Sequence, residues 1–170
     1  MTQLKFHLLY MQIKPYPLSS SSSRLRYTFT SQNKNNGQKQ EKIIEFSEIR
    51  SHKFAKLGLV SLFNLGFGDT PDGELIDDKS VTNNGDMETT LRTVAQAAED
   101  FFELHRSAVI FFQGSTPSRT RLYRMMLNKY YDDISIQFDI LGICDNGLKK
   151  LKKGSSVKYK AFLVKLRQQE

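Results

Sequence analysis

The sequence predicts an α+β fold, with one mixed sheet of about five to seven strands and two main helices. Three observations support this class. Runs rich in β-branched and aromatic residues fill the first third of the chain, two stretches in the middle have apolar residues at helical spacing, and short apolar runs follow each of those stretches. Strand runs that pass into alternating helices and strands are typical of α+β domains. The expected element order is βββ(β)αβαββ.

The first strands are expected to form a hairpin. The runs 26–30 and 42–49 are both of β type, and the polar segment between them contains the turn signal Asn35–Gly37. A third strand is predicted at 54–63, where apolar residues again dominate. These three runs together give the meander at the start of the predicted sheet.

The next segment, residues 64–74, is expected to be a surface loop. It holds three glycines, one proline and three acidic residues, all of which favour turns over regular structure. A short strand-like run at 75–81 follows the loop. It ends at Asn83–Asp86, where Asn-Gly stops a strand and the side chain of Asp86 can cap the following helix.

The first helix is predicted from Met87 to near His105. Its apolar residues recur at spacings of three and four, which draws one stripe along a helix. Acidic and polar residues lie off that stripe. The stripe consists of Met87, Leu91, Val94, Ala98, Phe101 and Phe102.

The second helix is expected to begin after a buried strand at 108–112. Thr116 has the residue type of an N-cap, and Pro117 stands at the first helical position, where its missing N–H costs nothing. Strands are predicted again at 134–143 and 157–163, with a lysine-rich loop between them.

Composition sets the domain organisation. With 170 residues, 39% of them hydrophobic, the chain can bury one core, and we expect a single domain over residues 25–167. Residues 1–24 read as a disordered or extended lead-in because of two prolines and the serine run 19–23, and Met11 is a candidate for the true start. The single Cys144 and the lack of an apolar run of about 20 residues favour a cytoplasmic protein without a membrane span.

The net charge of +7 is concentrated at the end of the chain. Residues 148–170 contain eight basic residues against Glu170, whereas the rest of the chain is neutral. A local basic patch attracts nucleic acid, but lysines also protect exposed edge strands from aggregation. The lysines assigned to non-specific nucleic-acid contact are Lys149, Lys150, Lys152, Lys153, Lys158 and Lys160.

The strand–turn–helix segment 114–124 is the main candidate site. A helix start with nearby guanidinium groups favours an anion, although Thr116 can equally cap the helix while the arginines pair with acidic residues. The turn at Asn83–Asp86 also precedes a helix, and both turns are expected to open on one edge of the sheet. The predicted ligand-binding residues are Ser115, Thr116, Arg119, Arg121, Arg124, Asn84 and Asp86.

A metal-dependent nuclease is the enzymatic alternative. The expected element order is similar to the ribonuclease-H-like architecture, whose enzymes hold two metal ions with clustered carboxylates. The first strand, 26–30, carries no acidic residue, and the acids crowd into predicted loops instead. We therefore assign no catalytic residue, metal ligand or cofactor. In this alternative Asp69 and Asp86 would be the ligands.

Four motifs resemble a family of small bacterial proteins of unknown function. They are Asn-Leu-Gly-Phe-Gly-Asp at 64–69, Asn-Asn-Gly-Asp-Met at 83–87, Gly-Ser-Thr-Pro-Ser-Arg-Thr-Arg-Leu-Tyr-Arg at 114–124 and Tyr-Lys-Ala-Phe-Leu-Val at 159–164. The resemblance covers residues 11–167. It implies a cytoplasmic, single-domain protein. The family has no known activity that the resemblance could assign to this chain.

Together these features favour a non-enzymatic binding module. Its ligand is expected to bear phosphate, with nucleic acid as one form of it, and no cofactor is expected. A protein partner in a two-protein system of the toxin–antitoxin type is the third alternative.

Overall fold

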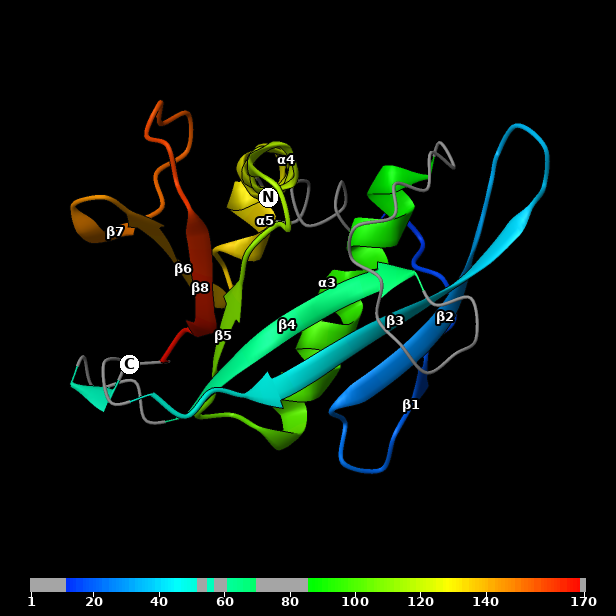
Figure 1. Ribbon diagram of the computed structural model, residues 1–170, viewed down its shortest axis with the longest axis horizontal. Coiled ribbons are helices and arrows are strands. Elements are labelled where there is room, and N and C mark those ends of the chain that lie inside the picture. The colour runs from blue at the N-terminus through cyan, green and yellow to red at the C-terminus, as the bar shows by residue number, and fades with distance from the viewer. Residues whose placement is uncertain (1–11, 52–54, 57–60, 70–85, 169–170) are drawn as a thin grey trace, which may run out of the picture. The chain divides into compact units, whose positions relative to one another are not determined.

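The computed structural model describes residues 12–51, 55–56, 61–69 and 86–168 (Figure 1). Within these residues it confirms the α+β class: eight strands form one mixed sheet in the order β1-β2-β3-β4-β5-β8-β6-β7, and two of the three helices described exceed one turn. The strands are β1 (Ser19–Ser20), β2 (Arg26–Gln32), β3 (Lys39–Glu48), β4 (Leu62–Asp69), β5 (Val109–Phe112), β6 (Phe138–Cys144), β7 (Gly147–Lys150) and β8 (Ala161–Leu166). The helices are α3 (Met87–Leu104), α4 (Pro117–Lys129) and α5 (Tyr131–Ile134).

One strand pair makes the sheet mixed. β4 and β5 run parallel, whereas β5 with β8, β6 with β8 and β6 with β7 are antiparallel. A parallel pair needs a long crossover connection, and α3 lies in the connection between β4 and β5. The predicted helix and the strand after it are therefore confirmed, whereas the predicted strand before the helix, 75–81, lies outside the described residues.

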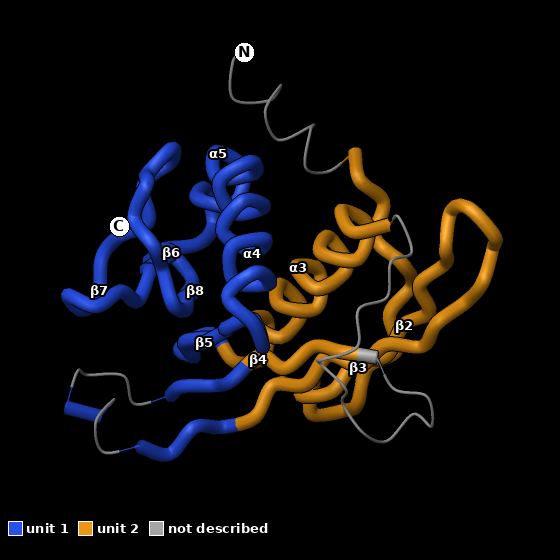
Figure 2. The backbone as a smooth tube through the Cα atoms, turned by 45° about the horizontal axis from the view of Figure 1, so that its top comes forward, with its two compact units in different colours: residues 1–7, 48–64, 106–170 blue, residues 8–47, 65–105 orange. Residues whose placement is uncertain are grey.

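The chain divides into two compact units, which Figure 2 colours separately. Unit 1 comprises residues 1–7, 48–64 and 106–170, and unit 2 comprises residues 8–47 and 65–105.

Unit 2 contains the predicted hairpin. β2 and β3 pair antiparallel, with Tyr27 opposite Ile44, and alternate residues of β2 are buried, as a strand with one solvent-facing side requires. Phe101 of α3 stacks on Phe46 of β3 with ring centroids 4.3 Å apart. Tyr27 meets the same Phe46 ring edge-on at 5.9 Å. Aromatic packing of this kind stabilises the helix against the hairpin.

The segment before β2 is attached to unit 2. β1 pairs antiparallel with β2. The backbone N–H of Tyr16 donates to Thr93 Oγ1 of α3 at 2.9 Å, and the Tyr16 ring stacks on Phe29 at 5.8 Å. The composition of this segment indicated extended backbone but gave no sign of these side-chain contacts.

The buried face of α3 differs from the predicted stripe. Its buried residues are Thr90, Arg92, Thr93, Ala97, Phe101 and Phe102. Met87, expected in the stripe, is exposed, and Leu91 is only partly buried. The prediction was wrong in its first two turns because Thr93 can be buried: its hydroxyl donates to Thr89 O and accepts from Tyr16.

Unit 1 has its own core. Ile140, Leu151, Tyr159 and Phe162 are buried together, and Tyr123 and Leu127 of α4 pack against them. Phe112 of β5 stacks on Phe162 of β8 with centroids 5.3 Å apart. The face of β6 and β8 that carries this cluster is thus covered by α4.

Several predicted strand boundaries were wrong. The third strand was expected at 54–63, but β4 spans Leu62–Asp69, so residues 64–69 are strand rather than loop. The two glycines of β4 weaken its strand signal, yet Phe67 stacks on Phe29 at 6.3 Å. Residues 70–85, with the expected remainder of the loop, the run 75–81 and Asn84, lie outside the described part of the chain.

The C-terminal strands also begin later than predicted. Residues 131–134 form α5, so β6 starts at Phe138, and β8 starts at Ala161 rather than at 157. The expected lysine loop contains β7, which forms a hairpin with β6. Gly147, with φ of +102°, supplies the backbone conformation that this turn requires.

Candidate functional site

The turn before α4 is bonded to the first turn of that helix. Thr116 is the N-cap, and its side chain accepts a hydrogen bond from the Arg119 N–H at 3.2 Å. The Arg119 guanidinium donates to Ser115 Oγ at 3.0 Å. Gly114 donates to the hydroxyl of the buried Thr120 at 3.1 Å, and a Cβ at Gly114 would lie 2.4 Å from the Thr120 nitrogen. The capping role of Thr116 and the placement of Pro117 are confirmed.

These contacts give the glycine and the hydroxyl residues of segment 114–120 roles within the fold. The oxygens of Ser115 and Thr116 already accept hydrogen bonds from Arg119, and Gly114 is needed for close approach of the backbone. The predicted anion site at the helix start therefore has a structural explanation for each of its residue types.

Arg121 and Arg124 lie on another side of α4. Spacings of three and four place Arg121, Arg124 and Asn128 along one face of the helix. Arg124 is partly buried and its Nη1 donates to the backbone oxygen of Val157 at 3.1 Å. Arg121 is exposed and makes no hydrogen bond or ion pair with another described residue.

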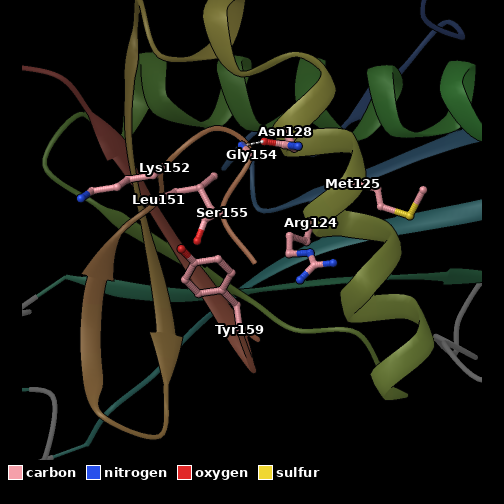
Figure 3. A pocket seen from close by; sticks show the side chains of 8 residues that line it. All are labelled: Arg124, Met125, Asn128, Leu151, Lys152, Gly154, Ser155 and Tyr159. Carbon is pink, nitrogen blue, oxygen red and sulfur yellow. Dashed lines mark hydrogen bonds between the residues drawn. The ribbon is translucent and has the colours of Figure 1, made fainter. Parts of the chain in front are cut away.

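A pocket of about 110 Å³ opens where this face of α4 meets residues 151–159. Figure 3 shows Arg124 between α4 and Tyr159, and the hydroxyl groups of Ser155 and Tyr159 turned toward each other. The ammonium group of Lys152 is turned away from them. The lining residues, none of them acidic, are Arg124, Met125, Asn128, Leu151, Lys152, Gly154, Ser155 and Tyr159. We call this the Arg124 pocket.

Two hydrogen bonds donated by backbone N–H groups hold the turn that forms the wall of the Arg124 pocket opposite α4. The Gly154 N–H donates to Asn128 Oδ1 at 2.7 Å, and the Val157 N–H donates to Ser155 Oγ at 3.2 Å. Gly154 has φ of +77°, a value that favours glycine. The turn that carries Ser155 is thereby fixed against α4.

Tyr159 is held by a glycine of the neighbouring strand. A Cβ at Gly142 of β6 would lie 2.1 Å from the Tyr159 ring, so only glycine leaves room for the ring on this face of the sheet. Arg124 was predicted from the sequence as a ligand-binding residue, whereas Asn128, Ser155 and Tyr159 were not. A signal for Asn128 was present, because it follows Arg124 by one helical turn.

The six predicted lysines all lie in unit 1 and are exposed. Lys149 stands opposite Gly142 in the sheet register, so it shares the face on which Tyr159 packs, whereas its neighbour Lys150 points to the other face. The lysines therefore do not form one flat patch. Four of them make no ion pair or hydrogen bond with a residue in the described ranges: Lys149, Lys150, Lys152 and Lys158.

The other two lysines make surface ion pairs. Lys153 Nζ lies 2.6 Å from Asp132 Oδ2, and Lys160 Nζ lies 2.5 Å from Asp145 Oδ1. The hydrogen bond to Asp145 raises the pKa of Lys160, and the same bond lowers the pKa of Asp145. Exposed pairs of this type contribute little stability.

Asp86 lies in unit 2 and is only 5% exposed. It occupies the N-cap position of α3, but its side chain makes no capping hydrogen bond, so the predicted capping role was wrong. Instead Asp86 Oδ2 accepts from the Tyr16 hydroxyl at 2.6 Å. Burial, together with this bond, raises the pKa of Tyr16. Asn84, the other residue predicted beside it, is outside the described part of the chain.

Charge is distributed unequally between the two units. The residues of unit 1 include 17 basic and 6 acidic side chains, a formal charge of +11. Those of unit 2 include 8 basic and 12 acidic side chains, a formal charge of −4. The last 23 residues have a net charge of +7. The positive charge of unit 1 is therefore larger than theirs, and other parts of the unit contribute to it.

The described residues contain no group of three or more His, Cys, Asp or Glu side chains placed to hold a metal ion. Side chains of the acidic segment after β4 are outside the described part. None of the helices seen here has the length and apolar content that a membrane crossing requires.

Fold and site define an α+β protein whose unit 1 exposes a surplus of cations. The chain belongs to a family of unknown function (DUF6934), whose model matches residues 12–167. No curated protein and no solved structure gives a significant match. The likeness to the ribonuclease-H-like architecture therefore stays a prediction.

Proposed function

We propose that this chain is a non-enzymatic binding module that takes a phosphate-bearing ligand on unit 1, with nucleic acid as that ligand. One observation carries the proposal: unit 1 has a formal charge of +11 while unit 2 has −4. Segregated charge of one sign raises the local concentration of a polyanion and speeds its association. The cytoplasm, expected from the single cysteine, is the compartment we assign to this activity.

The cations of unit 1 are available to phosphates. Arg121, Lys149 and Lys152 are exposed and make no ion pair with a described residue, and the pairs made by Lys153 and Lys160 are surface pairs. Each phosphate that such a cation neutralises releases a condensed counterion. Binding should therefore be driven by salt-sensitive contacts.

Fluorescence anisotropy of a labelled short DNA duplex, titrated with the protein at several salt concentrations, tests the proposal. If Arg121, Arg124, Lys149 and Lys152 each neutralise one phosphate, log Kobs should fall with log salt at a slope of about −3.6. That slope corresponds to about 150-fold weaker binding between 50 and 200 mM salt. A binding constant that does not change over this range, or no binding at the lowest salt, would contradict the proposal.

A further inference from the structure

We infer that the Arg124 pocket is a site for one phosphate group. The inference rests on the proposed function and makes it more specific, because it moves the site away from the start of α4. It follows from which hydrogen-bonding groups in the pocket are already used and which remain.

Three acceptor oxygens around the Arg124 pocket already take a hydrogen bond from the protein. Asn128 Oδ1 accepts from Gly154, Ser155 Oγ accepts from Val157, and Val157 O accepts from Arg124. These oxygens are therefore less open to a ligand than the N–H and O–H donors beside them.

The donors remain. The Arg124 guanidinium has five N–H groups and uses one of them on Val157. Because Asn128 Oδ1 is fixed toward Gly154, its NH₂ group is left for another partner. The hydroxyl hydrogens of Ser155 and Tyr159 are likewise free to rotate toward a ligand. A pocket of donors that includes a guanidinium group and no carboxylate selects an anion rich in acceptor oxygens.

Size narrows the class of anion. Pockets for drug-sized ligands have volumes of about 300–1,000 Å³, whereas the Arg124 pocket has about 110 Å³. It can admit a single tetrahedral group but not a nucleoside. A phosphate fits the donor set better than a carboxylate does, because its oxygens can meet the guanidinium and the hydroxyls from different directions.

Arg124 is positioned in advance for this contact. Its bond to Val157 O and its partial burial restrict the side chain before any ligand arrives, which reduces the entropy lost on binding. Arg121, one turn earlier on the same face of α4, is exposed and does not line the pocket. The two arginines therefore form a matched pair for a test.

The experiment uses the full chain labelled with ¹⁵N and follows the amide signals of Gly154 and Ser155 during titration with inorganic phosphate. We expect saturable shifts in the wild type, a loss of affinity of about tenfold or more in Arg124→Gln, and an affinity within twofold of wild type in Arg121→Gln. Equal weakening in both variants would show general charge attraction and overturn the inference, as would unchanged binding in Arg124→Gln.

Two further variants keep the test valid if Arg124→Gln perturbs the fold. Tyr159→Phe removes one hydroxyl and retains the ring that packs on Gly142, and it should weaken phosphate binding severalfold, whereas Ser155→Ala also removes the acceptor of the Val157 N–H and should weaken it at least as much. Unchanged phosphate binding in Tyr159→Phe would overturn the inference. A parallel titration with the DNA duplex separates the two claims. Salt-sensitive duplex binding without phosphate binding at Gly154 and Ser155 removes the pocket but not the proposed function, whereas phosphate binding without duplex binding supports the pocket for a free phosphate and removes nucleic acid.

Discussion

The two units use their charged side chains in different ways. In unit 2, several charged residues are paired within the fold: Asp100 accepts from the Tyr27 hydroxyl at 2.7 Å and lies 3.7 Å from Arg24, which also reaches Glu103. Lys42 and Arg92 are buried, although Lys34 and Lys39 are exposed. In unit 1 most of the described lysines and arginines are exposed, and the Arg124 pocket has no carboxylate in its lining.

This difference indicates where a ligand would bind. A charged side chain that is buried and bonded within the fold stabilises one conformation and is shielded from a partner in solution. A charge held at the surface without a partner contributes little to folding, so its abundance in one unit needs another explanation. We therefore expect mutations of charged residues to change mainly the free energy of unfolding in unit 2 and mainly ligand binding in unit 1.

The largest effect on stability is expected from removing Asp100. Its replacement by Ala leaves the hydroxyl of Tyr27, a residue only 1% exposed, without its acceptor, which costs about 1–3 kcal/mol. The matched change in unit 1 is Asp132→Ala, which removes a surface pair with Lys153 and should cost less than about 1 kcal/mol. Urea unfolding followed by circular dichroism measures both. If both variants lost the same free energy of unfolding, the two units would not differ in how their charged residues stabilise the fold.

A smaller effect is expected at the start of α4. Thr116→Ala removes the acceptor for the Arg119 N–H and should destabilise the protein by about 1 kcal/mol, whereas Thr116→Ser should retain most of the stability. Phosphate binding at the Arg124 pocket should be unchanged in both variants. If Thr116→Ala weakened phosphate binding and left stability intact, the helix start would be the site and our placement of it would be wrong.

The smallest effect is expected from alkaline pH acting on unit 2. Burial, and the hydrogen bond to Asp100, raise the pKa of Tyr27 above its ordinary value, as burial does for Tyr16. Above about pH 10 the unfolded chain loses the phenolic proton that the folded chain keeps, so the free energy of unfolding should fall as pH rises past this point. Urea midpoints measured from about pH 8 to pH 11 should decline less in Tyr27→Phe. An equal decline would show that Tyr27 is not the group responsible.

Much of the fold could be predicted from local sequence signals. The hairpin of β2 and β3, the extent of α3 and the cap of α4 by Thr116 all follow from periodicity, turn residues and capping chemistry, which act over a few residues. β4 was misplaced because its two glycines imitate a loop, and its packing partner Phe29 is distant in sequence. Distant contacts of this type leave no local signal.

The candidate site shows the same limit. The arginines of α4 were identified from sequence, but their bonding partners were not: Arg119 bonds back to Ser115, while Arg124 reaches Val157. Asp86 was expected to cap a helix, but Tyr16, 70 residues away, takes its carboxylate. Both outcomes depend on which segments the fold brings together, and spacing along the chain does not encode that.

The most direct test of the account compares two double variants that remove the same charge from different units. Lys149→Gln with Lys152→Gln removes two exposed cations from unit 1, and Lys34→Gln with Lys39→Gln removes two from unit 2. In salt titrations of duplex DNA binding, the unit 1 variant should lower the magnitude of the slope by about 1.8, and the unit 2 variant should keep the wild-type slope. Equal slopes in the two variants would contradict the claim that the cations of unit 1 meet the phosphates.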